Sequence, residues 1–275
     1  MGSVWSGEPA QEWRSGPWSL QLRDDELADL AYDGRVVLRS VRAVIRDRNW
    51  DTATLVVDRS DASGIAVTLH VHSDGLGADL RGIVRAEVRG AGRLRVIADL
   101  EAASDFETNR TGLVVRHPPA LAGAAMDVRH SDGTVAHSRF PIDRDARQQP
   151  PVDIVDLSWS QDDFGLAVRF AGDVFEMDDG HIDANAAYTT HSRPLALPTP
   201  YALAAGERVV QAVEITVSDH RGGGSAPGPT RGARVAVSPR SAPARRARAG
   251  TARCAHARRR ARRAPSAAGR PRCSR

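Results

Sequence analysis

Cysteine and lysine are the residues that this sequence lacks most clearly. Lysine is absent altogether, and the only two cysteines, Cys254 and Cys273, lie near the C-terminal end. Residues 1–220 can therefore form no disulfide, and they offer neither a thiolate ligand to zinc nor a cysteine nucleophile. All 38 basic residues are arginine, which we interpret as the amino-acid bias of a GC-rich gene and not as a binding device.

Long apolar segments are missing as well. No run of 18 apolar residues is present to span a membrane, and the start of the chain, MGSVWSGEPAQEWRSGPW, has neither the basic residues nor the apolar stretch of a secretory signal. We therefore expect a cytoplasmic protein with no membrane partner. The glycosylation pattern at Asn109-Arg110-Thr111 is then a chance match.

Acidic residues are missing from the last 55 residues. All 34 of them lie at or before Asp219, so residues 1–220 carry a net charge of −12 and residues 221–275 a net charge of +16. The last segment holds 16 arginines and 14 alanines and has no Leu, Ile, Phe, Tyr or Trp. Such a segment buries too little apolar surface to offset the entropy of ordering it. We therefore predict that residues 220–275 form a disordered, Arg/Ala-rich tail.

This tail has two interpretations. As an electrostatic arm, its ARRRARRA segment would neutralise several phosphates and release their counterions. No aromatic residue lies among the arginines, so bases would have no stacking platform and contact with nucleic acid would be non-specific. A GC-rich gene read in the wrong frame yields the same composition. We favour the frameshift, because the composition changes abruptly just after residue 219.

The preceding residues show the alternation of half-buried β-strands. Apolar residues recur at every second position, for example over residues 65–71, 84–88 and 94–100. This alternation is typical of antiparallel sheets with one buried and one wet face. We predict an all-β fold: an antiparallel β-sandwich over residues 16–219, preceded by a flexible N-terminus over residues 1–15.

Turn and helix signals fit the same architecture. Asp132-Gly133 has the composition of a tight hairpin turn. The only stretch with a helical spacing of apolar residues runs from Asp24 to Leu30. A parallel α/β fold is therefore disfavoured.

The segment FEMDDGHID, residues 175–183, concentrates acidic residues and a histidine. Such a cluster could bind a metal ion or supply paired carboxylates for acid and base catalysis. On a strand, however, Glu176 and Asp178 would share one face and Met177 would take the other, so only part of the cluster converges. We interpret the cluster as a solvated loop after a strand that ends near Phe175.

Motifs of known chemistry are absent from the sequence. It contains no GxSxG elbow, no glycine-rich phosphate loop before a helix and no HExxH. We therefore assign no catalytic residue, no metal ligand and no cofactor.

The segment FETNRTGLVVRHPP, residues 106–119, places polar residues inside a run that otherwise has the pattern of a strand. This interruption predicts a bulged or turned start of the strand. The guanidinium of Arg110 is suited to hold a carboxylate or sugar hydroxyls. The candidate substrate-binding residues are Asn109, Arg110, His117, Glu176 and Asp178.

Four stretches, taken together and in this order, resemble the D-apionate lactonase family, bacterial enzymes of sugar-acid catabolism. They are GPWSLQLRDDELADLAYDGRVVLRSVRAVIRDRNWDT (16–52), FETNRTGLVVRHPP (106–119), FPIDRDARQQPP (140–151) and FEMDDGHIDANAAYTTHSRPLALPTP (175–200). In the fourth stretch Glu176, Asp178, Asp179 and Tyr188 keep their places. Residues 180–183, Gly-His-Ile-Asp, replace the Gln-Arg-Asn-Trp of the family pattern.

The resemblance implies a β-sandwich that, in the family, precedes a TIM-type barrel and a further β domain. The barrel, where the catalytic carboxylates are expected, would begin where this chain becomes GGGSAPGPTRG. The implied function is that of the accessory N-terminal domain of a sugar-acid lactone hydrolase, truncated and inactive alone. The implied ligand is a sugar acid or its lactone.

The alternative is a stand-alone β-sandwich module that binds carbohydrate or protein and uses its basic tail as an electrostatic tether. The gene separates the two hypotheses. A shifted frame near codon 220 that encodes a barrel-like sequence would favour the accessory domain, and a coding frame that reads only as given would favour the module.

Overall fold

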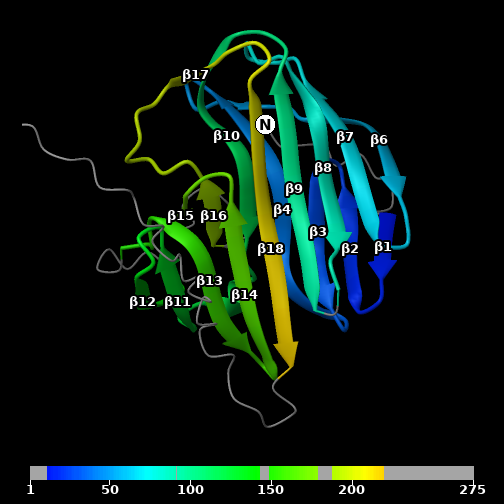
Figure 1. The fold of residues 1–275 in the computed structure, drawn as a ribbon, viewed down its shortest axis with the longest axis vertical. Helices are drawn as coiled ribbons and strands as arrows, with labels where there is room; N and C mark the ends of the chain where they lie inside the picture. The colour runs from blue at the N-terminus through cyan, green and yellow to red at the C-terminus, as the bar shows by residue number, and fades with distance from the viewer. Residues whose placement is uncertain (1–10, 91, 143–148, 179–187, 220–275) are drawn as a thin grey trace, which may run out of the picture. The chain divides into compact units, whose positions relative to one another are not determined.

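The computed structural model describes residues 11–90, 92–142, 149–178 and 188–219. All of them belong to the first of the two units into which the chain divides, Met1–Ser225. The predicted disordered tail, residues 220–275, lies outside the described residues. The described part is built of antiparallel strands (Figure 1).

One layer is a sheet with β4 and β10 at its centre. Its strands pair in the order β1, β2, β3, β4, β10, β16, β15, with the short strands β5 beside β4 and β17 beside β10. The bounds are β1 (Gln11–Ser15), β2 (Trp18–Arg23), β3 (Glu26–Tyr32), β4 (Arg35–Asp47), β5 (Thr52–Ala53), β10 (Phe106–Arg116), β15 (Phe175–Asp178), β16 (Thr189–Ser192) and β17 (Tyr201–Leu203).

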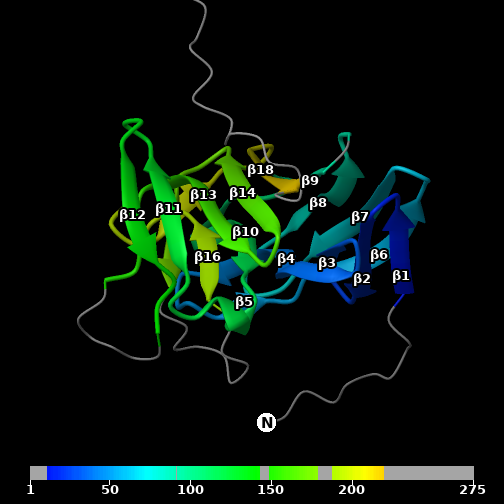
Figure 2. The same ribbon diagram turned by 90° about the horizontal axis from the view of Figure 1, so that it is seen from below.

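The second layer pairs its strands in the order β6, β7, β8, β9, β18, β14, β13, β11, β12. The bounds are β6 (Val56–Ala62), β7 (Ala66–Ser73), β8 (Leu80–Val88), β9 (Arg93–Ala102), β11 (Ala125–His130), β12 (Val135–Arg139), β13 (Ile154–Gln161), β14 (Phe164–Ala171) and β18 (Arg208–Asp219). A 3₁₀ turn, η1 (Pro119–Leu121), follows β10. One pairing, Ile154 with Phe175, joins the layers at one side, and Figure 2 shows them one above the other.

The core lies between the two layers and follows the predicted alternation. In β9, Leu94, Val96, Ala98 and Leu100 are fully buried, and the residues between them are half-buried. Facing residues of β4 and β10 fill the same core. Burial of these alternate side chains is the main force that holds the layers together. The predicted antiparallel β-sandwich is therefore confirmed.

The N-terminal boundary differs from the prediction. Residues 11–15, predicted to be flexible, form β1, which pairs with β2. Trp13 explains the difference, because its ring is buried and its indole N–H donates to the carbonyl oxygen of Ser63 at 3.0 Å. Within the described residues, the sandwich therefore includes residues 11–15.

The helical spacing over Asp24 to Leu30 was misleading, because residues 26–32 form strand β3. Pairing registers on both sides of β3 shift near Asp29, which has a positive φ of 46°. Such a bulge adds a residue to the strand and breaks the period of two. The buried residues of β3 therefore recur every three positions, as on a helix.

Two further expectations concern turns and membrane spans. The predicted hairpin is confirmed, since β11 and β12 flank the Asp132-Gly133 turn and Gly133 has a φ of 86°. None of the described segments forms a helix of the length and apolarity that crossing a membrane requires.

His117, directly after β10, is part of the core. Its side chain is fully buried between the rings of Phe140 and Trp159, at centroid distances of 5.3 and 5.7 Å. Its Nε2 lies 2.8 Å from the hydroxyl oxygen of Thr190. Burial lowers the pKa of His117 to about 3, so the ring is neutral in the folded protein.

Substitution of Gly112 by alanine should destabilise the sandwich. Gly112 has a φ of 153°, and a Cβ there would lie 2.3 Å from the Oγ of Ser192 and 2.4 Å from the Oε1 of Gln211. That Oε1 accepts a hydrogen bond from the backbone N–H of Leu113. We expect a loss of about 2 kcal/mol or more in the free energy of unfolding, measured by urea denaturation.

Gly133→Ala is the matched control for this substitution. Gly133 also has a positive φ, but a Cβ there meets nothing within 4 Å. Its loss should be about 1 kcal/mol, due to backbone strain alone. If both variants lose the same free energy of unfolding, the contacts of Ser192 and Gln211 with position 112 do not explain the loss.

The pKa of His117 also predicts how stability depends on pH. Because this pKa is about 3 in the folded protein and 6.5 for an ordinary histidine, the unfolded chain binds a proton first as pH falls. Stability is therefore full above pH 6.5 and decreases below it, by about 1.4 kcal/mol per pH unit for this residue. In His117→Gln the slope between pH 6 and pH 5, from urea denaturation, should be smaller by that amount. An unchanged slope would contradict the prediction.

Candidate functional site

The candidate site begins at an irregularity in β10. Thr108 lies opposite Asp47 of β4 and Arg110 lies opposite Arg46, so Asn109 is an additional residue with no partner in β4. The β-bulge predicted at the start of this strand is therefore confirmed. Because of it, Thr108 points toward the core while Arg110, two residues later, points to the opposite face of the sheet.

Polar contacts hold the bulge in place. The hydroxyl of Thr108 donates to the carbonyl oxygen of Arg46 at 2.5 Å and lies 3.0 Å from the hydroxyl of Thr111. The side-chain amide of Asn109 donates to the carbonyl oxygen of Arg48 at 2.9 Å. These bonds satisfy the polar groups that the extra residue leaves without a ladder partner.

Strands β15 and β16 bring acidic and imidazole groups to the same face. Glu176 lies directly opposite His191 in the pairing of these strands, and Asp178 follows on the same side of β15. Met177, between the two carboxylates, is buried in the core. The predicted sharing of one strand face by Glu176 and Asp178 is therefore confirmed.

The interpretation of this segment as a solvated loop after Phe175 is wrong for residues 176–178. Phe175–Asp178 is a strand, and Glu176 is only 6% exposed. Its burial follows from pairing with β16 and from the backbone N–H of Leu195, which donates to Oε1 of Glu176 at 2.9 Å. The remainder of the predicted acidic cluster, residues 179–183, lies outside the described residues.

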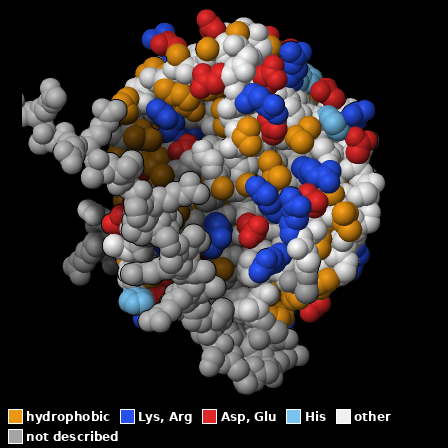
Figure 3. All heavy atoms as spheres, in the orientation of Figure 1, with side chains coloured by type: hydrophobic (Ala, Val, Ile, Leu, Met, Phe, Trp, Pro, Cys, Tyr) orange, Lys and Arg blue, Asp and Glu red, His pale blue; other side chains and the backbone are white. Residues whose placement is uncertain are grey.

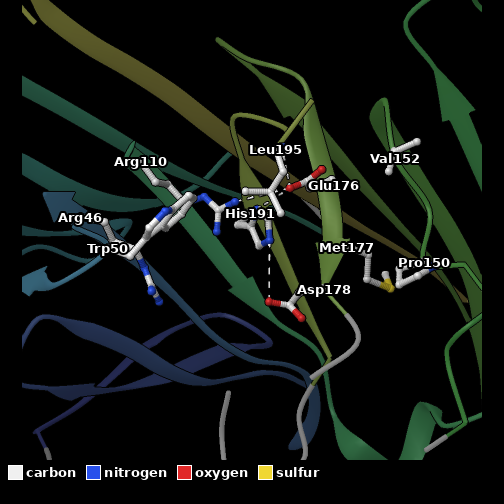
Figure 4. A pocket seen from close by; sticks show the side chains of 10 residues that line it. All are labelled: Arg46, Trp50, Arg110, Pro150, Val152, Glu176, Met177, Asp178, His191 and Leu195. Carbon is white, nitrogen blue, oxygen red and sulfur yellow. Dashed lines mark hydrogen bonds and ion pairs between the residues drawn. The ribbon is translucent and has the colours of Figure 1, made fainter. Parts of the chain in front are cut away.

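These side chains line a cavity of about 400 Å³ (Figure 4). Its described lining residues are Arg46, Trp50, Arg110, Pro150, Val152, Glu176, Met177, Asp178, His191 and Leu195. Trp50 is 37% exposed and lies in the loop after β4, with its ring 5.4 Å from the guanidinium carbon of Arg110. The volume is within the range of about 300–1,000 Å³ that small-molecule sites occupy.

The floor of the cavity is a network of buried charges. Arg110 and Glu176 form an ion pair of 3.4 Å, and Nδ1 of His191 lies 3.8 Å from the same carboxylate oxygen. Nε2 of His191 lies 4.0 Å from Asp178. Among the described residues, Nε of Arg110 and Nδ1 of His191 are buried without a hydrogen-bond partner.

Burial shifts the pKa values of this network toward neutral forms. It raises the pKa of Glu176, against the N–H of Leu195 and the charge of Arg110. It lowers the pKa of Arg110, and the nearby charge of Arg46 lowers it further. It lowers the pKa of His191 to about 3, with the two arginines acting in the same direction, so this imidazole is neutral.

The predicted binding residues divide into two groups. Arg110, Glu176 and Asp178 meet in the cavity. Asn109 does not line it and instead stabilises the bulge, and His117 lies in the core. The sequence pattern alone could not separate residues that line the cavity from residues that stabilise the fold. The difference depends on the face of the bulged strand to which each side chain points.

Seven of the ten described lining residues were not predicted from the sequence, and four of them contribute polar or aromatic groups or a backbone N–H: Arg46, Trp50, His191 and Leu195. A signal for them was present, since all four lie inside the stretches that carry the family resemblance. Leu195 contributes its backbone N–H, which no side-chain pattern reveals.

Other regions of the described structure are weaker candidates. A second hollow, of about 570 Å³, is lined by Asp25, Arg42 and neighbouring residues, and these two charges pair with each other at 2.8 Å. In the described part of the chain no three His, Cys, Asp or Glu residues are grouped so that they could hold a metal ion. Figure 3 shows basic and acidic side chains interspersed over one face, so the described residues there form no basic patch for nucleic acid.

The cavity has the groups that polyhydroxylated ligands require. Carboxylates and a neutral imidazole accept hydrogen bonds from hydroxyls, guanidinium groups donate to hydroxyl or carboxylate oxygens, and an aromatic ring offers an apolar wall. The site is therefore suited to a small, polar ligand that carries several hydroxyl, carbonyl or carboxylate oxygens.

A family model and a curated relative identify the family of this domain. The family model described as D-apionate lactonase, N-terminal domain, matches residues 2–220. A D-apionate lactonase of Brucella anthropi is 35% identical over 216 residues, which cover 76% of this chain and 35% of that protein. The chain thus spans about a third of the length of this curated relative.

A solved structure of similar fold is the galactose 1-epimerase of Lactobacillus acidophilus NCFM. The TM-score is 0.51, with 11% identity, and the match covers 75% of this chain and 93% of that one. At this identity the likeness concerns the fold alone. The family match agrees with the four stretches of the sequence, and the chain belongs to the family of D-apionate lactonase N-terminal domains.

Proposed function

We propose that this chain is the accessory, ligand-binding domain of a sugar-acid lactone hydrolase. It holds a sugar acid or its lactone in the cavity between β4, β10, β15 and β16, and it does not hydrolyse the lactone by itself. The observation that carries the proposal is the convergence of Arg110, Glu176, Asp178 and His191 beside the ring of Trp50 in one cavity.

Buried charges with incomplete pairing support a binding role. Arg110 is 6% exposed and its Nε has no partner among the described residues, and the same holds for Nδ1 of His191 at 4% exposure. A buried polar atom without a partner destabilises the fold by about 1–3 kcal/mol. The fold keeps these groups beside the cavity despite this cost, which favours a role in binding over a role in stability alone.

The same groups are poorly placed to open a lactone. Lactone hydrolysis needs a base that activates water and donors that stabilise the carbonyl oxygen as it gains charge. His191, with a pKa of about 3, is a weak base at neutral pH. Oε1 of Glu176 already faces Arg110 and the N–H of Leu195, which limits its contact with a water molecule.

The family supports the choice of ligand. The relative from Brucella anthropi is named D-apionate lactonase, and this chain corresponds to about a third of it. We therefore extend its named substrate, a sugar-acid lactone, to the cavity described above. The alternative is a stand-alone module that binds carbohydrate or protein. It would bind a carbohydrate in the same cavity, but it would not be part of a longer hydrolase.

Replacement of Trp50 tests the binding role. The purified chain should bind D-apionate or its lactone in isothermal titration calorimetry. Trp50→Ala should weaken this binding about tenfold, because it removes the aromatic wall, whereas Trp50→Phe should retain most of it.

Ile65→Ala is the matched control, because Ile65 is 58% exposed and does not line the cavity. It should bind as the wild type does. The binding proposal fails if neither ligand binds, or if Trp50→Ala binds as well as the control.

The absence of hydrolysis by the isolated chain is tested with a pH-stat. Lactone added to the chain should release acid no faster than in buffer. Glu176→Gln is the informative variant, because Glu176 is the carboxylate at the floor of the cavity. Turnover by the wild type that this substitution abolishes would show that the domain itself carries the chemistry.

A further inference from the structure

Two arginines stand directly opposite each other across the pairing of β4 and β10. Arg46 is the register partner of Arg110, and both line the cavity. Like charges at directly opposite positions of an antiparallel pair repel each other and destabilise the sheet. The effect of Arg46 is visible at its neighbours, since it lowers the pKa values of both Arg110 and His191.

Only one of these arginines has a counter-ion among the described residues. Arg110 pairs with Glu176 at 3.4 Å. Arg46 has neither an ion pair nor a side-chain hydrogen bond with any described residue, and its Nε is buried without an acceptor. Among the described residues, the guanidinium of Arg46 therefore lines the cavity without a carboxylate paired to it.

The two walls of the cavity differ in chemistry. Figure 4 shows Arg46 and Trp50 on one side, and Met177, Pro150 and Val152 on the other. The carboxylate of Asp178 lies near His191, between these sides. A ligand that fits this arrangement has an anionic end toward Arg46 and hydroxyl groups toward Asp178 and His191.

We propose that the cavity selects the open-chain, ionised sugar acid over the neutral lactone, with Arg46 as the residue that binds the carboxylate. The inference rests on the proposed function and adds the ionic form of the ligand to it. A guanidinium and a carboxylate form two parallel, charge-assisted hydrogen bonds. A lactone offers the same position an uncharged ester, which gains no such pairing.

This selection means that the domain binds the product of lactone opening better than the substrate. One charge-assisted contact in a partly exposed cavity corresponds to an affinity ratio of about tenfold in favour of the acid. In a longer family protein, this domain would then hold the acid. The lactone would stay free to bind to the rest of that protein.

Three matched ligands separate charge from ring opening. They are D-apionate, its primary amide and its freshly dissolved lactone, each titrated into the full chain by isothermal titration calorimetry at pH 7. The amide is open-chain and uncharged, so it differs from the acid in charge and from the lactone in its ring. The acid should bind about tenfold more tightly than both neutral ligands.

Substitutions at Arg46 test the assigned residue. Arg46→Gln should lower the affinity for the acid about tenfold and leave the affinity for the amide unchanged, and Arg46→Lys should retain part of the preference. Arg48→Gln is the control, because it removes an equal charge two residues away, where Arg48 pairs with Glu107 at 3.0 Å. This control should keep the full preference for the acid.

Salt dependence gives a readout that needs no variant. Affinity for the acid should fall as sodium chloride is raised, and affinity for the amide should not, because salt screens a partly exposed charge pair. Equal binding of acid and amide, or a preference that survives Arg46→Gln, would overturn the inference and leave the proposed function standing. If none of the three ligands binds, the proposed function fails together with it.

Discussion

The bulge at Asn109 is the constraint on which both the sandwich and the cavity depend. In an unbroken strand Thr108 and Arg110, two residues apart, would share a face. The additional residue lets Thr108 face the core opposite Asp47 and turns Arg110 to the other face, opposite Arg46. One irregularity therefore lets β10 contribute to the core along its length and still carry a charged group into the cavity.

The ion pair that this bulge creates is better explained by function than by stability. Burying a charge pair removes water from both ions, and the attraction between them often only balances that loss. Here Arg110 and Glu176 are each 6% exposed, their separation is 3.4 Å, and Nε of Arg110 has no acceptor among the described residues. A pair meant only for stability would have tighter geometry and satisfied atoms.

The sequence was a good guide to the fold because a period of two is a local property of the chain. The burial of β9 and the turn at Gly133 follow from neighbouring residues alone. The false helical spacing near Asp29 and the pairing of Arg46 with Arg110 depend on bulges and register. Register joins residues that are 64 positions apart in this case, and no local pattern encodes it.

Strands and connecting segments contribute different kinds of side chain to the candidate site. Arg46, Arg110, Glu176 and His191 lie on paired strands, whose hydrogen-bond ladders fix their positions. Trp50 and the other apolar residues of the rim come largely from connecting segments, which tolerate sequence change without loss of the fold. The charged groups of the candidate site are therefore positioned by the sheet, whereas much of its apolar rim is positioned by the connecting segments.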